Sequence, residues 1–387
     1  MPGLKINFQT RKNKIVALVL GVTIISLLLG VYWNFYRPVT MLEANFCQEK
    51  LPKSALSLND SISKIRQHPD LFFYKIDHPD KQGNLGRNKN EQLYSSPDFQ
   101  RKMWELFLEA VETKNTIELD EAFNAMELPF NHMLPNGDFV FTPFTNVSLN
   151  DQNITGYDGH SGNGGNYFFM WSVGITLQIL KESDWFNIDT ATINFRERLK
   201  NLTSPILKAE DYLSSAKNLA ILDKDVKADN RIWIKAIAFY GPGIYVNNAN
   251  LTSIGTRYAK QALSNFDSKT GIFSENGGGD TSYQGVNLLV ASQFSFLLPS
   301  TDPLKTQIQN AVICGSKWEI NQADVSGKIS VDNNTRVKAN GEKYYGTVKN
   351  LDVWAVNWGL AFGSSFANQD NLWQKTIVIS NHKVFYR

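Results

Sequence analysis

The amino-acid sequence predicts a mainly α fold: an (α/α) toroid of helical hairpins with short β-hairpins in the loops, preceded by one transmembrane helix. Three observations lead to this prediction. An uncharged apolar run lies near the N-terminus, apolar segments with helical periodicity follow, and a glycine turn recurs between them. About eight to ten helices in antiparallel pairs are expected. A plain helical bundle is the alternative, although bundles do not usually carry long glycine-rich loops at the same end of successive hairpins.

The N-terminal region carries a signal for membrane insertion. Residues 15–33 form a run of 19 residues without a charge, which is long enough to cross a bilayer as a helix. The basic tail, residues 1–14, is expected in the cytoplasm, with the main domain periplasmic or extracellular. A cleaved signal peptide is the alternative. Because aromatic residues rather than a small-residue cleavage site follow the run, an uncleaved signal anchor is favoured.

Composition restricts the function classes. Hydrophobic residues make up 42% and charged residues 20% of the 387, which is typical of a globular protein. Four basic residues precede residue 15, so residues 15–387 carry 35 Lys and Arg against 37 Asp and Glu, and no nucleic-acid partner is predicted. The nine tryptophans and fourteen tyrosines suit either sugar binding or helical cores. The oligomeric state is left open.

The only two cysteines are Cys47 and Cys314. A disulfide between them is possible in an oxidising compartment. The sequence contains neither a Cys/His metal cluster nor a CxxC motif, so no metal and no cofactor are predicted.

The domain organisation follows from the proline pattern and the first helices. Residues 34–95 are interpreted as a stalk and domain entrance, because the stretch is rich in proline and weakly patterned. Residues 96–387 are interpreted as the toroid domain. Its first helix begins at Ser96-Pro97, a cap followed by a proline, and a second spans 117–128.

A turn followed by a short extended piece recurs three times. It contains Gly137, Gly271 and Gly327, the last two 56 residues apart. Each copy is preceded by a helix and followed by a polar loop and another helix, which indicates a repeat of helical hairpins. The expected helices of this repeat are 167–180, 251–266, 304–318, 351–366 and one starting near 280; the pair 205–222 and 229–247 forms a hairpin without the strand.

Three polar, glycine-containing loops are expected at one mouth of the toroid. They are residues 156–167, 271–287 and 338–352. The middle loop is the richest, because three consecutive glycines stand among two carboxylates, a tyrosine, a glutamine and asparagines.

The candidate catalytic residues lie in the first two loops. Glu275 and Asp280 could form an acid–base pair, although Asp280 is also a good helix N-cap. Tyr283 could donate or accept a proton, or fill the core. His160 could act as a base near neutral pH, or have a structural role or simply be exposed.

The candidate substrate-binding residues are Asn163, Asn166, Gln284, Arg257, Lys343 and Tyr344. The asparagines could hydrogen-bond a carboxylate or hydroxyl, or serve only left-handed turns. The two basic residues could bind a carboxylate, or lie on the solvated surface.

Two motifs carry a family resemblance. The run from Asn276 to Gly285, Asn-Gly-Gly-Gly-Asp-Thr-Ser-Tyr-Gln-Gly, occurs with Gly-His-Ser-Gly-Asn-Gly-Gly-Asn at 159–166. Together with the hairpin repeat they resemble the (α/α)-toroid polysaccharide lyases of the alginate, chondroitin and heparin type, over about residues 95–366. The resemblance implies that Tyr283 and His160 handle the proton at C5 of a uronate and that Asn163 neutralises its carboxylate. The loops depart from the pattern by lacking a dense Arg/Lys cluster, which argues against a highly charged substrate.

The expected function is that of a membrane-anchored, exported carbohydrate-active protein, a polysaccharide lyase cleaving a uronate-containing glycan by β-elimination. One alternative is a glycoside hydrolase that pairs Asp280 or Glu275 with Asp158. Another is a non-catalytic protein of glycan binding or cell-envelope assembly.

Overall fold

The computed structural model describes residues 47, 55–71, 76–90, 92, 94–140, 164–344 and 347–382. The chain divides into two compact units, 1–45 and 46–387, and every described residue belongs to the second. The predicted tail and anchor, 1–14 and 15–33, lie outside the described residues. Among the helices that are described, none combines the length and apolar character needed to cross a bilayer.

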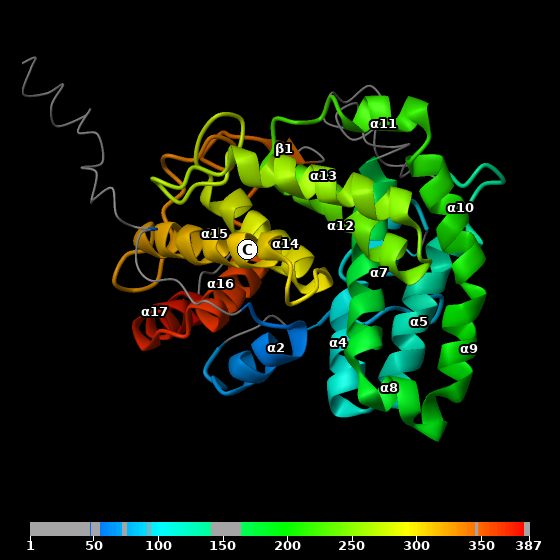
Figure 1. Ribbon diagram of the computed structural model, residues 1–387. Coiled ribbons are helices and arrows are strands. Elements are labelled where there is room, and N and C mark those ends of the chain that lie inside the picture. Colours follow the sequence, from blue (N-terminus) through cyan, green and yellow to red (C-terminus); the bar gives the residue numbers. More distant parts are fainter. Residues whose placement is uncertain are drawn as a thin grey trace, which may run out of the picture. The chain divides into compact units, whose positions relative to one another are not determined.

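The described part of the chain is mainly helical, as predicted (Figure 1). The longer helices are α2 (Leu58–Arg66), α4 (Met103–Thr113), α5 (Thr116–Asn131), α7 (Gly164–Glu182), α9 (Ile193–Asn201), α10 (Thr203–Leu213), α12 (Asp229–Tyr245), α13 (Ala249–Asn265), α14 (Thr281–Leu297), α15 (Pro303–Asn321), α16 (Val353–Ala367) and α17 (Asp370–Asn381). The short elements are α3 (Gly86–Asn90), η1 (Pro97–Gln100), α8 (Asp184–Ile188), η2 (Thr190–Thr192), α11 (Ala216–Leu222) and the antiparallel strands β1 (Lys343–Tyr344) and β2 (Thr347–Val348).

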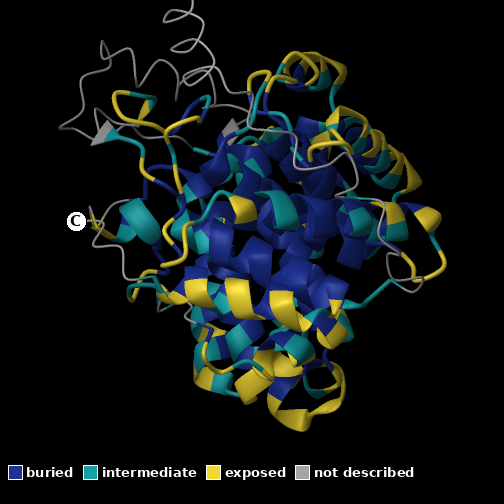
Figure 2. Ribbon diagram, turned by 90° about the vertical axis from the view of Figure 1, so that its left-hand side faces the viewer, coloured by how far each residue is buried: buried dark blue, intermediate teal, exposed yellow. Residues whose placement is uncertain are grey.

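The helices follow one another as hairpins whose first members pack together. Helix α4 contacts α7, α7 contacts α12, α12 contacts α14, and α14 contacts α16. The second members, among them α5, α13, α15 and α17, each pack on their own partner. In Figure 2 the buried residues concentrate on the central helices and the exposed ones at the periphery. The apolar residues that predicted the helices therefore line a shared core.

Helix α16 returns to α4. The indole N–H groups of Trp354 and Trp358 both donate to Oε1 of Glu105, each at 2.7 Å. The ring of Trp104 lies against that of Trp358 with centroids 5.2 Å apart. Because Glu105 is buried, these bonds are needed to satisfy its carboxylate. The first helices of the first and last hairpins are thereby joined.

The recurring glycine turn is present at all three predicted positions. The glycines have φ of 91°, 82° and 86°, a region that side chains avoid, which explains the residue type. Each predicted extended piece is a single antiparallel bridge; the bridges are Met133–Phe139, Asp267–Ile272 and Ala323–Ile329. Each turn packs on a later second helix: a Cβ on Gly271 would lie 2.7 Å from the carbonyl oxygen of Cys314 in α15. A fourth turn of this kind, at Gly83, has φ of 90° and packs on α5.

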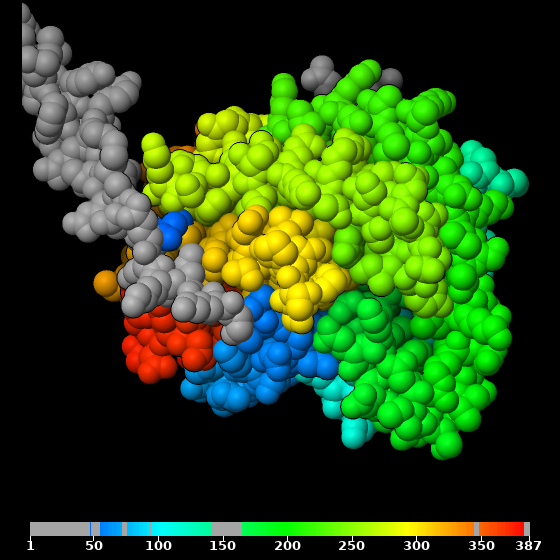
Figure 3. All heavy atoms as spheres, in the orientation of Figure 1, coloured from blue at the N-terminus to red at the C-terminus, as the bar shows by residue number. Residues whose placement is uncertain are grey.

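The stretch before residue 96 is not a stalk where it is described. Helix α2 begins with a capping box in which Ser57 and Asp60 bond reciprocally. Its side chains Leu58, Ile62 and Ile65 are buried in the core, and the helix packs on α16. Just after the helix, His68 stacks on Trp373 of α17, where the blue and red surfaces adjoin in Figure 3. Apolar residues spaced three and four apart explain this burial, and they correct the boundary that the sequence placed at residue 96.

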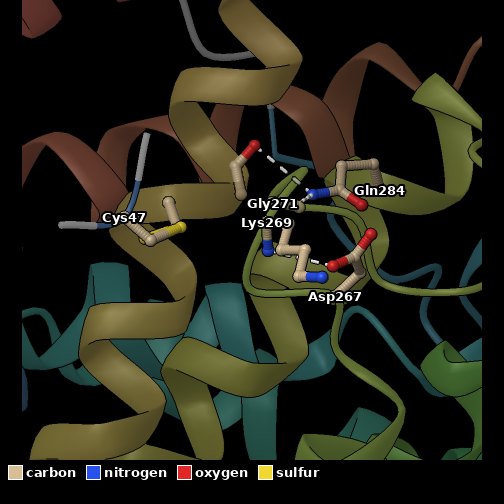
Figure 4. The surroundings of a disulfide bond; sticks show 7 residues. Cys47, Asp267, Lys269, Gly271 and Gln284 are labelled. Carbon is tan, nitrogen blue, oxygen red and sulfur yellow. Dashed lines mark hydrogen bonds between the residues drawn. A yellow bond between two sulfur atoms is a disulfide. The ribbon is translucent and has the colours of Figure 1, made fainter. Parts of the chain in front are cut away.

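Cys47 and Cys314 form a disulfide, with Cα atoms 5.3 Å apart. Figure 4 places Cys47 beside the turn that contains Asp267 and Gly271. The bond connects the start of the second unit to helix α15 in the C-terminal third of the chain.

Candidate functional site

We call the first helix of each hairpin its leading helix. The leading helices have their first turns at the same end of the helical domain. The hydroxyl of Tyr167, in α7, donates to Asp225 before α12 at 3.3 Å. The backbone N–H of Asn230, in α12, donates to Glu275 before α14 at 3.2 Å, and the N–H of Asp352 before α16 donates to Ser282 Oγ in α14 at 2.9 Å. We call this end the mouth, defined by Tyr167, Asp225, Glu275, Ser282 and Asp352.

Asp280 is the N-cap of α14 at the mouth. Its Oδ1 accepts the N–H of Tyr283 at 3.1 Å, and its Oδ2 accepts the N–H groups of Arg336 and Val337, both at 2.8 Å. The Nδ2 of Asn334 adds a fourth bond at 3.4 Å. A buried carboxylate with four donors is occupied in holding the 334–337 loop, so the capping interpretation describes this residue better than acid–base catalysis.

Gln284 is also occupied by the backbone. Its Oε1 accepts the N–H of Phe273 at 3.0 Å, and its Nε2 donates to the carbonyl oxygen of Gly271 at 2.9 Å (Figure 4). The side chain is fully buried. Gln284 therefore fixes the recurring turn and is not available to a ligand.

Glu275 forms a buried ion pair at the mouth. Its Oε2 accepts Nη1 of Arg336 at 2.9 Å, and its Oε1 accepts the amide of Asn287 at 3.1 Å in addition to Asn230. The carboxylate has no exposed surface and Arg336 is 8% exposed. Burial raises the pKa of Glu275 to about 7, although Arg336 opposes that shift.

Tyr283 lies among cations. Its hydroxyl accepts Nζ of Lys349 at 2.7 Å, and the guanidinium of Arg336 lies over its ring, 3.8 Å from the centroid. Burial raises the pKa of Tyr283 above its usual value, with Arg336 opposing. No acceptor for its hydroxyl proton is found among the described residues. Tyr283 is therefore protonated at neutral pH and able to donate.

Glu342 joins the two cations. It accepts both Nε and Nη2 of Arg336, at 2.8 and 3.2 Å, and Nζ of Lys349 at 2.6 Å. Although burial acts to raise it, the pKa of Glu342 falls to about 2 because of these bonds. The cluster of Glu275, Arg336, Glu342, Lys349 and Tyr283 is thus one continuous hydrogen-bonded network, which we call the mouth network.

A cavity of about 650 Å³ opens beside the mouth network. We call it the basic cavity. Its charged lining residues are Lys224, Lys227, Arg231, Arg336 and Lys338 against Asp225 and Glu342. The sequence shows no dense Arg/Lys cluster because these cations come from two segments more than a hundred residues apart. In space these five cations line one cavity.

The other predicted site residues are dispersed. Asn166 is buried and donates to Asp138 at 2.7 Å, with its own oxygen unpartnered. Arg257 is on α13 and pairs with Asp223 at 2.9 Å, and it lines a different cavity from the mouth network. Lys343 is exposed on β1, of which Tyr344 is the other residue. Asp158, His160 and Asn163 lie outside the described residues.

Sequence reasoning did not single out Arg336, Lys349 or Arg231. Arg231 pairs with Asp225 at 3.1 Å and lines the basic cavity from the first turn of α12. Glu342 and Lys349 lie inside the third predicted loop, residues 338–352. No local pattern marks Arg336, whose partners are 61 and 6 residues away.

Comparison with known proteins finds no matching family model, no matching curated protein and no matching solved structure. Across the described residues, no group of three or more His, Cys, Asp and Glu is arranged to hold a metal ion.

Proposed function

We propose that this chain is a carbohydrate-active protein that binds an acidic glycan at the mouth and cleaves it by β-elimination. The observation that carries the proposal is the basic cavity beside the mouth network. Within that network the hydroxyl of Tyr283 is hydrogen-bonded to Lys349. Five cationic side chains against two carboxylates favour an anionic ligand, and the exposed Lys224, Lys227 and Lys338 supply charge that no described carboxylate pairs.

The reaction needs three contributions. A base removes the C5 proton of the uronate, a role proposed for His160 on the resemblance alone. Positive groups stabilise the negative charge that then develops on the carboxylate, a role for the cations of the basic cavity. The C4–O4 bond breaks as the C4=C5 double bond forms, and the leaving oxygen takes a proton from Tyr283.

The surroundings of Tyr283 suit a proton donor. Its raised pKa keeps the hydroxyl protonated before the reaction. After proton transfer, the phenolate would lie 2.7 Å from the ammonium of Lys349 and under the guanidinium of Arg336. Both cations stabilise the phenolate more than the phenol, so they lower the barrier to donation.

We also propose the finer architecture and location. The contacts between successive leading helices, with the return of α16 to α4 through Glu105, support an (α/α) toroid. The Cys47–Cys314 disulfide supports export, because disulfides persist in oxidising compartments. With the apolar run at 15–33, it favours a membrane-anchored protein whose main domain lies outside the cytoplasm.

The hydrolase alternative needs either Asp280 or Glu275 as one of its two catalytic carboxylates, and both are engaged in other bonds. Asp280 accepts four hydrogen bonds and is fully buried, and Glu275 is paired with Arg336. A general acid must reach the glycosidic oxygen, which neither geometry favours.

The test is incubation of the full chain with uronate-containing polysaccharides, measuring ultraviolet absorbance of unsaturated uronate and the release of reducing ends. We expect both to rise together, and Tyr283→Phe to lower kcat by about 100-fold or more. The matched control is Tyr240→Phe, on α12 in another cavity, with unchanged activity expected. Reducing ends without absorbance would reject elimination. Binding that is unaffected by Tyr283→Phe and His160→Ala, with no cleavage, would favour a non-catalytic protein.

A further inference from the structure

Helix α12 carries a buried lysine, Lys235, that the proposed reaction does not use. Its side chain has no exposed surface, and its ammonium group donates to the backbone carbonyl oxygens of Leu222 at 2.8 Å and Asp225 at 2.6 Å. Burial lowers the pKa of Lys235 to about 8, with Asp225 opposing that shift, so the side chain is largely charged at neutral pH. A buried ammonium is costly unless it is bonded, and these two bonds go to one short stretch of backbone.

Residues 223–228 connect α11 to α12, and both aspartates of this connection are anchored. Asp223 accepts the hydroxyl of Tyr258 at 2.7 Å and Nη1 of Arg257 at 2.9 Å. Asp225 likewise accepts one tyrosine and one arginine, through the two contacts described at the mouth. The connection is therefore held by side chains of α7, α12 and α13, in addition to the buried ammonium.

The two lysines of the same connection line the basic cavity. The side chains of Lys224 and Lys227 are exposed. Lys224 stands between the two anchored aspartates, and the carbonyl oxygen of Lys227 accepts the N–H of Asn276 at 2.9 Å. The backbone that carries both lysines is therefore fixed, although their side chains are in solvent.

We infer that Lys235 is a positioning residue for the basic cavity: its buried ammonium holds the 223–228 connection where Lys224 and Lys227 can meet an anionic ligand. The inference rests on the proposed function, because it concerns how the same site is built. Without this ammonium, two backbone carbonyl oxygens lose a donor and the connection opens more often. Lysines on a mobile connection bind an anion less tightly than lysines at fixed positions, because ordering them on binding costs entropy.

The first measurement needs no ligand. Trypsin cuts after lysine, and a cut within a folded chain requires the local segment to open. We expect Lys235→Met to speed cleavage of the full chain after Lys224 and Lys227 about tenfold or more. The matched control is Lys305→Met, since Lys305 is also a buried lysine bonded to a backbone carbonyl oxygen, that of Leu298. It should leave these two cuts unchanged.

The second measurement is the affinity of the full chain for tetragalacturonate and tetramannuronate, by calorimetry. Lys235→Met should raise the dissociation constant of the tighter probe about tenfold. When Lys224 and Lys227 are already alanine, the same substitution should change it less than about twofold, because no cation remains to be positioned. General destabilisation would act equally in both backgrounds. Tyr258→Phe, which removes one bond to Asp223, should shift both measurements in the same direction by a smaller factor.

The failures can be told apart. Unchanged cleavage in Lys235→Met, unchanged affinity, or an equal loss of affinity in both backgrounds overturns the inference and leaves the acidic-glycan site standing. Absence of binding of either probe to the parent protein contradicts the proposed function, and the inference falls with it. Thermal melts show whether Lys235→Met and Lys305→Met are folded at the working temperature. If Lys235→Met is not, Tyr258→Phe carries the same test, and no change in either measurement overturns the inference.

Discussion

Two buried glutamates, one at the mouth and one in the core, respond differently to the same burial. Glu275 and Glu319 are both inaccessible to solvent. The carboxylate of Glu275 accepts hydrogen bonds from Arg336, Asn287 and Asn230. Both carboxyl oxygens of Glu319, in α15, lack a hydrogen-bond partner. Burial raises the pKa of each, to about 7 for Glu275 and, with Asp280 adding repulsion, well above the ordinary value for Glu319. The guanidinium of Arg336 opposes the rise in the pKa of Glu275, whereas no hydrogen bond opposes the rise for Glu319.

Replacing Arg336 should have the largest effect on this contrast. Arg336→Ala leaves Glu275 buried without its cation, for which about 3–5 kcal/mol of unfolding free energy is expected to be lost. Urea unfolding at pH 8 measures it. Lys338→Ala, an exposed neighbour in the same cavity, is the control and should leave the midpoint unchanged. Similar midpoints for the two variants would mean that the mouth carries no buried charge.

Next in size is the pH dependence due to Glu275. Its folded pKa, about 7, lies above the unfolded 4.5, so it stabilises the fold below pH 4.5, and that stabilisation is lost as the pH rises through 7. The unfolding free energy of the parent protein, relative to Glu275→Gln, should fall by about 3 kcal/mol across this window. Asp229, whose pKa burial raises to about 6, acts with the same sign in both proteins and cancels. A difference independent of pH would contradict the assignment.

The smallest effect should come from the core glutamate and have the opposite sign. Glu319→Met replaces two unpartnered polar atoms by an apolar side chain of similar length, so the unfolding free energy should rise by about 1–3 kcal/mol. Chemical denaturation at neutral pH measures the change. The matched Glu275→Met should destabilise, since it leaves Arg336 without one of its two carboxylates. Destabilisation by Glu319→Met would show that its carboxyl group has a partner in solution.

The fold could be predicted from the sequence where the residues of one short segment determine its own conformation. The glycine turns at Gly137, Gly271 and Gly327 were found because positive φ restricts the residue type. Helix α17 (Asp370–Asn381) and helix α2 (Leu58–Arg66) were missed, although each buries apolar residues at helical spacing, because flanking polar and proline-rich sequence concealed that spacing. The packing of each leading helix on the next depends on contacts that no single segment encodes.

The site could be predicted only in part, for a physical reason. Glu275 and Tyr283 share one stretch and do lie in one network, but their chemical state is set by Arg336 and Lys349, more than sixty residues further on. Asp280 had two interpretations from sequence, and backbone donors from a distant loop decide for the cap. Electrostatics at a site depends on distances in space, which residue spacing along the chain does not supply.

The Cys47–Cys314 bond also determines what proteolysis can release. The bond closes a loop with a sequence separation of 267 residues. A single proteolytic cut between Cys47 and Cys314 leaves the two fragments covalently joined. After such a cut, the fragments separate only when the disulfide is reduced. Tension applied through the N-terminal segment would likewise reach α15 directly through the sulfurs, bypassing α2 and the hairpins between.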